Sequence, residues 1–422
     1  MIGYEQALER LMAHARQLPA ERCARSAALG RVLASDVISP MALPSFDHAA
    51  MDGYALNASQ PCEAGSEHVV IGSQAAGDKA QSSSGMAWEI MTGAHLPDGL
   101  NAVVPVERTQ LLETRADGAP QRIRLLDRLE QGANVRYAGS DVAEGRTVIT
   151  AGTRIEPAHV MLLAALGVAT VAVVRAPRVA VIATGKELQP DPTQPLVPGQ
   201  IYGSNGPYLV AALAAAGAQV LSCDTVDDTA DTYADAIQRA HRAGADVIIS
   251  TGAVSMGRYD FVPDTLRALG AELLFHKVAM RPGKPLLAAR LANGTLVMAL
   301  PGTPMAVAVG FRFFVVPVLR AMRGQATERP LYAVLDAPQQ SKPGLCHFLR
   351  ATVTQDREGR LHAHVLSRPQ PFRMEPFVQA DVWVVLPENA GECLAGSMVL
   401  IAGLQPGALF AEMSQMPQEA AS

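Results

Sequence analysis

Two polar residues with possible chemical roles lie on separate loops of small residues in the first quarter of the chain. Asp52 precedes Gly53 in the segment PSFDHAAMDGYA, and Thr92 precedes Gly93 in the segment MTGAHLPDG. Asp-Gly is a tight-turn signal, and a turn can hold a side chain toward a metal or an anion. Each loop also suits an ordinary turn that the polar residue caps, so neither loop decides the question alone.

A third loop pairs opposite charges. The segment VRYAGSDV at residues 135–142 contains Arg136 and Asp141 on either side of small residues. Two such side chains can bind a polar ligand. They can also form a surface salt bridge, which contributes little to stability.

Two further loops of small and hydroxyl residues follow predicted buried strands. They are ATGKE at residues 183–187 and STGAVSMG at residues 250–257, the second of which leads to Asp260. Small residues let backbone N–H groups approach an anion closely, although structural turns use the same residues. Two such loops in one sheet favour an anion site over two unrelated turns.

Cations and a capped helix start lie close together near residue 300. The segment KVAMRPGKP holds Lys277, Arg281 and Lys284 in a chain that is otherwise mildly acidic, and two prolines stiffen it. The next motif, LPGTPMA, offers Thr303 as an N-cap and Pro304 as the first helical residue. A helix that begins there would present free N–H groups to an anion, and the cations would form an anion clamp. A solvated charge run and a simple capped helix are the alternatives.

The hydrophobic pattern indicates which elements position these loops. Residues 4–17 have the spacing of an amphipathic helix, and residues 45–135 are rich in glycine and in short β-prone runs such as HVVIG. Between residues 177 and 325, buried strands alternate with helices, which predicts a parallel sheet covered on both faces. Ligands bind at the carboxyl ends of the strands in such sheets. Short strands with Pro and Gly turns after residue 327 indicate a small β-barrel.

We therefore expect an α/β multidomain protein. A helical and extended linking domain comprises residues 1–44 and 136–176, and a small β-rich module lies between them at residues 45–135. The central α/β domain comprises residues 177–326, the C-terminal β-barrel residues 327–412, and a frayed tail residues 413–422.

Composition limits the classes of function. The 422 residues are 49% apolar and carry a formal net charge of −5 with no long basic run, which argues against a general nucleic-acid binder. The five cysteines are odd in number and widely spaced, which argues against a disulfide framework or a zinc site. The N-terminus lacks the pattern of a signal peptide, and the apolar residues 306–319 are too few to span a bilayer. We expect a soluble cytoplasmic protein with neither a nucleic-acid nor a membrane partner.

Seven segments together resemble the motifs of the molybdopterin molybdenumtransferase family, which includes bacterial MoeA proteins and the E domain of gephyrin. In order along nearly the whole chain, they are FDHAAMDGYA, IMTGAHLPDGLNAVV, VRYAGSDV, ATGKEL, STGAVSMGRYDF, KVAMRPGKP and LPGTP. The resemblance implies an elongated homodimer whose active site lies between the α/β domain of one subunit and the β module of the other. It implies adenylylated molybdopterin and molybdate as substrates, Mg²⁺ as the metal, and AMP and molybdenum cofactor as products. The preceding molybdopterin adenylyltransferase and the recipient molybdoenzymes are the implied partners.

The resemblance also implies roles for individual residues. The implied catalytic residues are Asp52, Thr92, Asp141, Glu187 and Asp260. The implied metal ligands are Asp52, Glu187 and Asp260. The implied substrate-binding residues are Arg136, Thr184, Gly185, Ser204, Asp227, Gly252, Ser255, Lys277, Arg281, Lys284, Pro301, Thr303 and Pro304. These types fit the chemistry, because cations and helix N-termini hold anions and Mg²⁺ prefers carboxylate oxygens beside phosphate.

The chain departs from the family pattern at several positions. Lys186 stands where most members have Asp, Ala253 where they have Gly, and Thr303 where they have Asn. The bulky run at residues 372–377 stands where small residues are usual. A paralogue that binds or carries molybdopterin or its cofactor with impaired catalysis is therefore an alternative. The adenylyltransferase would share the α/β domain alone, and a generic oxidoreductase would need a GxGxxG motif after a strand.

Overall fold

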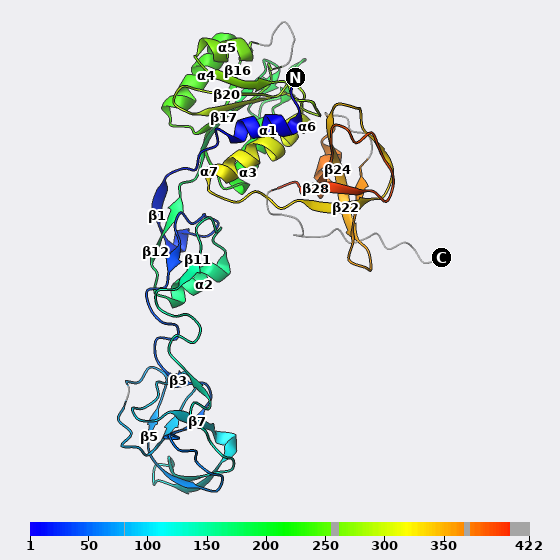
Figure 1. The fold of residues 1–422 in the computed structure, drawn as a ribbon. Coiled ribbons are helices and arrows are strands. Elements are labelled where there is room, and N and C mark those ends of the chain that lie inside the picture. Colours follow the sequence, from blue (N-terminus) through cyan, green and yellow to red (C-terminus); the bar gives the residue numbers. More distant parts are fainter. Residues whose placement is uncertain (80, 255–260, 367–371, 406–422) are drawn as a thin grey trace.

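The protein is elongated and divides into a broad end and a narrow end. The structure, a computed structural model, describes residues 1–79, 81–254, 261–366 and 372–405. Figure 1 shows the α/β domain and the barrel next to each other, with a narrow arm that carries a compact β module away from them. The expected α/β multidomain architecture is confirmed. The predicted tail at residues 413–422 lies outside the described residues.

The α/β domain is built on a six-stranded sheet in the order β16-β13-β17-β21-β20-β18. Its strands are β13 (Arg178–Thr184), β16 (Gln219–Val226), β17 (Val247–Thr251), β18 (Glu272–His276), β20 (Leu287–Arg290) and β21 (Leu296–Leu300). Strands β16, β13, β17 and β21 run parallel, as the alternation of strands and helices predicts. Strand β17 is buried throughout, because an apolar run such as VIIST is covered on both faces of the sheet.

The sheet is mixed rather than wholly parallel. Strand β20 runs antiparallel to both of its neighbours, β21 and β18. The cause is a tight hairpin between β20 and β21, in which Asn293 precedes Gly294 with φ +97°. An Asn-Gly pair is a common hairpin signal. The predicted parallel sheet therefore has an antiparallel edge, which the pattern of strands and helices did not indicate.

Helices cover both faces of the sheet. They are α1 (Tyr4–Met12), α3 (Asn205–Ala215), α4 (Ala230–Arg242), α5 (Val262–Ala268), α6 (Pro304–Gly310) and α7 (Val316–Met322). Helices α4 and α5 pack in one apolar cluster, and α1, α3, α6 and α7 pack in the other. Helix α1, which the sequence pattern groups with residues 136–176, packs here against α7 and β18 because it buries Ala7 and Leu11.

One continuous helix lies on the face of the sheet that α1 and α3 also cover. It comprises α6, the π-helical turn η3 (Phe311–Val315) and α7, and it spans Pro304–Met322. Its 19 residues are long and apolar enough to cross a membrane, but 83% of its apolar window is buried inside the protein, as in a core helix. The helix is longer than its sequence suggests because Pro317 is the second residue of α7, just after the π-helical turn, where a missing backbone N–H is tolerated.

The C-terminal region is a closed barrel of five strands in the order β24-β25-β22-β28-β26, with β26 pairing back to β24. The strands are β22 (Leu331–Leu335), β24 (Cys346–Gln355), β25 (Leu361–Val365), β26 (Val382–Leu386) and β28 (Met398–Gly403). The predicted barrel is confirmed. Smaller elements flank it, namely β19 (Met280–Arg281), which pairs with β24, the ladder of β23 (Gln339–Gln340) with β27 (Glu392–Cys393), and α8 (Glu375–Val378).

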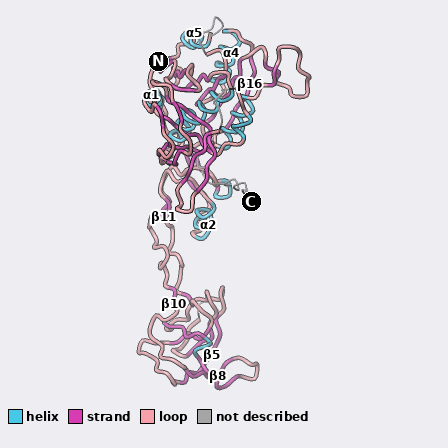
Figure 2. The backbone as a smooth tube through the Cα atoms, turned by 90° about the vertical axis from the view of Figure 1, so that its right-hand side faces the viewer, coloured by secondary structure: helices cyan, strands magenta, loops and turns pink. Residues whose placement is uncertain are grey.

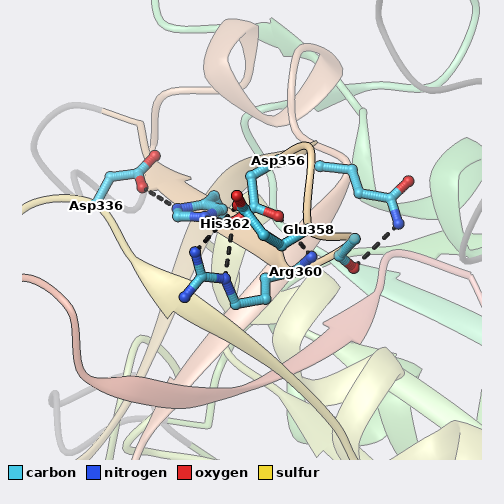
Figure 3. A network of polar contacts seen from close by, with 7 residues as sticks. Asp336, Asp356, Glu358, Arg360 and His362 are labelled. Atoms are coloured by element: carbon cyan, nitrogen blue, oxygen red, sulfur yellow. Dashed lines mark hydrogen bonds and ion pairs between the residues drawn. The ribbon is translucent and has the colours of Figure 1, made fainter.

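A polar network lies on the barrel, away from its apolar interior (Figure 3). His362 lies between two carboxylates, with Nδ1 2.9 Å from Asp336 and Nε2 3.1 Å from Asp356. Hydrogen bonds to Asp356 and Asp336 raise the pKa of His362. Although burial opposes it, hydrogen bonds from His362 and Arg360 lower the pKa of Asp356 to about 2.

The linking domain consists of thin ladders and one helix. Its elements are β1 (Ala20–Ala24) paired with β12 (Thr170–Val174), β2 (Val37–Ile38) paired with β11 (Thr147–Ile149), η1 (Arg25–Ala27) and α2 (Pro157–Ala165). Beyond them the chain narrows to a neck, defined here as residues 39–47 and 137–146, which is mostly loop (Figure 2). The linking domain without α1, the neck and the β module together form the arm.

The β module at the end of the arm holds a second six-stranded sheet, in the order β7-β4-β6-β5-β9-β8. Its strands are β4 (Gly53–Leu56), β5 (Glu67–Gln74), β6 (Ala87–Ile90), β7 (Ala102–Pro105), β8 (Thr109–Thr114) and β9 (Pro120–Leu125), and η2 spans Val106–Arg108. A two-residue ladder of β3 (His48–Ala49) with β10 (Val135–Arg136) closes the module where the neck enters it. The predicted small β-rich module is thus confirmed.

Candidate active site

Three predicted loops meet at the neck end of the β module. The N–H of Gly93 donates to the carbonyl oxygen of Ala49 at 2.9 Å. The N–H of Ala50 donates to the carbonyl oxygen of Asn134 at 2.9 Å. The backbone around Ala49 therefore holds the other two loops beside it, although the three are far apart in the sequence.

Asp52 and Thr92 form a direct pair at this place. The backbone N–H of Thr92 donates to Oδ1 of Asp52 at 2.7 Å, and the Thr92 hydroxyl donates to the same oxygen at 2.8 Å. These two bonds lower the pKa of Asp52, so the carboxylate is ionised at neutral pH. Both residues are exposed. Thr92 thus holds a charged carboxylate in a fixed orientation at the surface.

The segment that runs from Arg136, at the end of β10, to Asp141 in the neck is also fixed. Asp47 Oδ1 accepts a hydrogen bond of 2.7 Å from the N–H of Ala138, and the N–H of Asp141 donates to the carbonyl oxygen of Leu43 at 3.0 Å. Arg136 and Asp141 are both exposed. The β module and the neck therefore present these two charges at the surface where they join.

A cavity of about 360 Å³ opens at the carboxyl ends of β13 and β17, as the strand-end loops predict. The predicted residues in its wall are Thr184, Glu187, Ser204, Gly252 and Pro304. Asp228 also lines this cavity and accepts a hydrogen bond of 3.2 Å from the N–H of Lys186. Hydroxyls, backbone groups and two carboxylates therefore border one space, which we call the first cavity.

The wall of the first cavity includes a close backbone crossing and a strained residue. Gly252 has φ +96°, and a Cβ there would lie 2.6 Å from the carbonyl oxygen of Thr184. Ala253 has φ +48°, which is a left-handed backbone conformation. A left-handed conformation costs a residue with a Cβ about 1–2 kcal/mol. The departure from Gly to Ala therefore places backbone strain at the cavity.

A second cavity of about 520 Å³ lies between the α/β domain and the barrel. The predicted residues in its wall are Arg281, Lys284, Pro301 and Thr303. The barrel adds Arg350, which is 4% exposed and donates to the carbonyl oxygen of Arg373 at 2.6 Å. Burial and the nearby Arg373 lower the pKa of Arg350, but a guanidinium still stays protonated. Three cations around one cavity favour an anionic ligand.

The loop that begins helix α6 separates the two cavities. Gly302 lines both of them, and its carbonyl oxygen accepts a hydrogen bond of 2.8 Å from Asn205. Thr303 occupies the N-cap position, as predicted, but its side chain makes no capping hydrogen bond. The expected side-chain cap is therefore absent at Thr303. The first turn of the helix still directs the positive end of its dipole toward this loop.

Several predicted residues lie elsewhere. Within the described parts of the two cavity walls, Gly185, Asp227 and Lys277 are not included. Asp227 instead accepts a hydrogen bond from the Thr232 hydroxyl at its carbonyl oxygen, while the adjacent Asp228 lines the cavity. Spacing alone cannot decide which of two neighbouring acids points into a site. Ser255 and Asp260 lie outside the described residues.

Sequence reasoning also missed Arg350. The signal was present, because an arginine interrupts the mostly apolar strand HFLRATV, and a buried charge in a strand calls for a functional or structural partner.

The Asp52–Thr92 pair belongs to the β module, and the two cavities belong to the α/β domain and its border with the barrel. These two parts lie at opposite ends of the subunit (Figure 1). One subunit therefore does not gather all of the predicted residues in one place. In the part of the chain that the structure describes, no group of three or more His, Cys, Asp or Glu residues is arranged to hold a metal ion.

Three protein-family models match the chain in sequence. The MoeA N-terminal region (domains I and II) matches residues 2–167, and a probable molybdopterin-binding domain matches residues 180–321. The MoeA C-terminal region (domain IV) matches residues 332–404. A molybdopterin molybdenumtransferase of Bacillus subtilis is 35% identical over 395 residues, which cover 92% of this chain and 90% of that protein. The chain belongs to the MoeA family of molybdopterin molybdenumtransferases.

Other MoeA relatives agree over nearly the whole length. A molybdopterin molybdenumtransferase of Synechococcus elongatus is 33% identical over 414 residues, which cover 96% of this chain and all 100% of that protein. The crystal structure of a molybdopterin biosynthesis MoeA protein from Pyrococcus horikosii superposes with a TM-score of 0.80 at 29% identity. The match covers 96% of this chain and 99% of that one. Membership of the MoeA family assigns the chain to molybdenum cofactor biosynthesis.

Proposed function

We propose that this enzyme transfers molybdenum from molybdate to adenylylated molybdopterin and releases AMP and the molybdenum cofactor. The observation that carries this proposal is the pair of cavities on either side of the loop at Gly302. One cavity is lined by hydroxyls and carboxylates, and the other by three cations. Two such compartments side by side suit a reaction that joins an oxyanion to a phosphate-bearing substrate.

The first cavity suits the adenylylated phosphate of the pterin. Helix α3 begins at its wall, directly after Ser204, so the positive end of the helix dipole favours a phosphate there. Glu187 and Asp228 supply carboxylate oxygens, which Mg²⁺ prefers beside phosphate. These residues fit Mg²⁺ with phosphate and water oxygens as its remaining ligands. When bound, Mg²⁺ would neutralise charge on the phosphates during hydrolysis of the adenylyl link.

The second cavity suits molybdate. Arg281, Lys284 and Arg350 surround it, and Arg350 is held in place by its hydrogen bond to the Arg373 carbonyl oxygen. A doubly charged oxyanion gains charge-assisted hydrogen bonds from such donors, which are stronger than neutral ones. The shared loop then brings the oxyanion next to the pterin.

We further propose a homodimer in which Asp52 of the partner subunit completes the site. Within one subunit the β module, which holds the Asp52–Thr92 pair, lies far from the α/β domain and the barrel, which hold both cavities (Figure 1). An ionised carboxylate held outward at the surface is suited to meet a second chain. Light scattering at micromolar concentration is expected to give a dimer, and a monomer would contradict the shared site.

The cellular setting follows the same reasoning. We propose that the enzyme works in the cytoplasm, receives adenylylated molybdopterin from the adenylyltransferase, and supplies molybdoenzymes. All five cysteines are free, which is consistent with a reducing compartment.

The test is an assay of AMP release from adenylylated molybdopterin with molybdate and Mg²⁺. Release that depends on both supports the proposal. Binding of the pterin without AMP release supports the second candidate, an impaired paralogue that carries the cofactor. The strained Ala253 in the cavity wall is the observation that favours this second candidate.

A charge-reversal variant tests the metal assignment. The backbone N–H of Lys186 donates to Asp228, so its side chain emerges beside an acid of the first cavity. Lys186→Asp changes the local charge by two units, and we expect the Mg²⁺ concentration for half-maximal AMP release to fall several-fold. Lys342→Asp on the barrel makes the same change of charge away from the cavity and is the control. Identical Mg²⁺ titration curves for Lys186→Asp and the natural protein would show that the charge of Lys186 does not affect the metal site.

A further inference from the structure

The arm meets the α/β domain at a junction made largely of polar contacts. Arg175 at the end of β12 forms two hydrogen bonds, of 2.9 and 2.8 Å, with the carboxylate of Asp246 at the start of β17. The N–H of Leu18 donates to the carbonyl oxygen of Met322 at 2.8 Å. Through these contacts, the two chain segments that lead into the arm are bound to the α/β domain. The segment at Arg175 is bound to the start of β17, and the segment at Leu18 is bound to the end of helix α7.

Arg323, the C-cap residue of α7, joins the two sides of this junction. Its Nη1 donates to the carbonyl oxygen of Ala216, at the end of α3, at 2.7 Å. Its Nη2 donates to the carbonyl oxygen of Gly30, in the linking domain, at 2.7 Å. Because guanidinium donors form a rigid planar fork, the two bonds fix the direction between the two domains as well as their distance.

The surrounding backbone forms a socket for this guanidinium. A Cβ at Gly217 would lie 2.5 Å from Nη1 of Arg323, so the space that the guanidinium fills depends on a glycine. On the arm side, Gly152 has φ +79°, and a Cβ there would lie 3.1 Å from the carbonyl oxygen of Gly324. The two domains therefore approach each other closely on both sides of Arg323.

Stability alone is a poor reason for this arrangement. Arg323 is 8% exposed, and no salt bridge among the described residues includes it. Burial and the nearby Arg154, Arg31 and Arg320 lower its pKa to about 10. A buried cation without an acidic partner is costly, and apolar replacements of buried charges are often neutral or stabilising. The main contribution of Arg323 is therefore to the relative orientation of the two domains and not to stability.

The arm connects this junction to the active site that we propose the two subunits share. The β module, which holds the Asp52–Thr92 pair, lies at the far end of the arm from the junction (Figure 1). A small rotation at the junction therefore moves this carboxylate by a much larger distance. We propose that Arg323 is a positioning residue that sets the angle of the arm and so aligns Asp52 with the cavities of the partner subunit. This inference rests on the proposed shared active site.

The variant Arg323→Met in the full-length protein tests whether the orientation of the arm can change while the affinity for the pterin substrate stays the same. We expect small-angle X-ray scattering to show an altered overall dimension, because the arm loses its fixed angle. The affinity for adenylylated molybdopterin should stay within about twofold, since Arg323 lines neither cavity within the described walls. The kcat for AMP release should fall about tenfold to a hundredfold, because a misplacement of about 1 Å can reduce the rate by up to about a hundredfold.

Two related variants serve as controls. Arg323→Lys keeps a donor that can reach one carbonyl oxygen, and we expect an intermediate kcat. Arg320→Met makes the same change three residues earlier on the same helix, where the side chain donates to Ala326 rather than to the arm, and should leave the scattering profile and kcat unchanged.

Gly152→Ala perturbs the junction from the arm side without removing a charge. It should lower kcat at unchanged pterin affinity, as Arg323→Met does. A change in the scattering profile with normal kcat in both variants would overturn the positioning role. Equal losses of pterin affinity, kcat and thermal stability would also overturn it, because they would indicate a purely structural residue.

Failure of the proposed function gives a different result. If the natural protein releases no AMP, the proposed reaction is wrong, while the scattering comparison still reports whether Arg323 fixes the arm. Unchanged scattering for Arg323→Met and Gly152→Ala would reject the inference even if the natural protein is fully active.

Discussion

The α/β domain is joined to the barrel and to the arm by junctions of opposite character. At the barrel junction, the ring centroid of Phe313 lies 4.3 Å from the ring centroid of Phe348 and 6.4 Å from that of Trp383. All three side chains belong to one of the two apolar clusters that cover the sheet. At the arm junction, the principal contacts are the directed hydrogen bonds of Arg323 and Arg175.

The difference follows from what each junction must do. Apolar burial is non-directional and grows with the contact area, whereas a few hydrogen bonds hold selected atoms in a defined direction. The barrel contributes Arg350 directly to the second cavity, so it must stay pressed against the α/β domain. The arm carries Asp52 away from its own α/β domain, so its angle matters more than its contact area.

The largest expected effect on activity comes from the end of the arm. Asp52→Ala should reduce the rate of AMP release by at least about a thousandfold, or ~4 kcal/mol of activation free energy. The free energy of unfolding should change by less than about 1 kcal/mol, because an exposed carboxylate has few packing contacts to lose. Asp127→Ala, an exposed acid in the same module, is the matched control for both measurements. Normal turnover or unfolding of Asp52→Ala would show that Asp52 is irrelevant or structural.

The largest expected effect on stability comes from the barrel junction. Trp383 is 1% exposed, and Trp383→Ala should lower the free energy of unfolding by about 3–5 kcal/mol through lost burial and a residual cavity. Urea denaturation measures this loss, and equilibrium dialysis should show weaker molybdate binding because Trp383 also lines the second cavity. Phe372→Ala removes a ring that is 64% exposed and should have little effect on stability. Equal losses for the two variants would contradict an apolar junction.

A smaller effect is expected at the first cavity. Ala253→Gly should stabilise the protein by about 0.5–1 kcal/mol, since relief of a strained positive φ outweighs the extra freedom of Gly in the unfolded chain. Ala243→Gly is the control, because Ala243 has φ −73° and should lose stability instead. Thermal unfolding measures whether each variant gains or loses stability. A loss of stability in Ala253→Gly would contradict backbone strain at Ala253.

The smallest effect is expected on the barrel surface, away from both junctions. Because the folded pKa of His362 is raised, its contribution to stability is complete below the unfolded pKa of about 6.5 and is lost as the pH rises through the folded value. His362→Gln should therefore flatten the decline of barrel stability above about pH 6.5. Unfolding midpoints across this range measure the effect, and kcat should be unchanged since His362 lies in neither described cavity wall. Identical pH profiles for the two proteins would refute the ion-pair assignment.

Much of the first cavity could be predicted from local sequence. Thr184 and Gly252 end neighbouring parallel strands, and parallel strand ends meet at one edge of a sheet, so their meeting follows from the alternation of strands and helices. Asp228 could not be preferred to Asp227, because the direction of a side chain in a loop depends on contacts outside that loop. Likewise, a helix start was predicted at Thr303, but its missing side-chain cap depends on the surrounding structure.

The sequence by itself determined the local units of this protein, because helical and strand periodicity, tight turns and the apolar barrel strands depend on residues close together in the chain. It also contained enough ordered motifs to indicate the MoeA family. Only the tertiary structure decided how these units meet. Arg350 completes a cavity with Lys284 from another domain, and Arg323 binds the carbonyl oxygen of Gly30 across 293 residues of sequence. Such contacts depend on the packing of whole domains, which no local pattern of residues encodes.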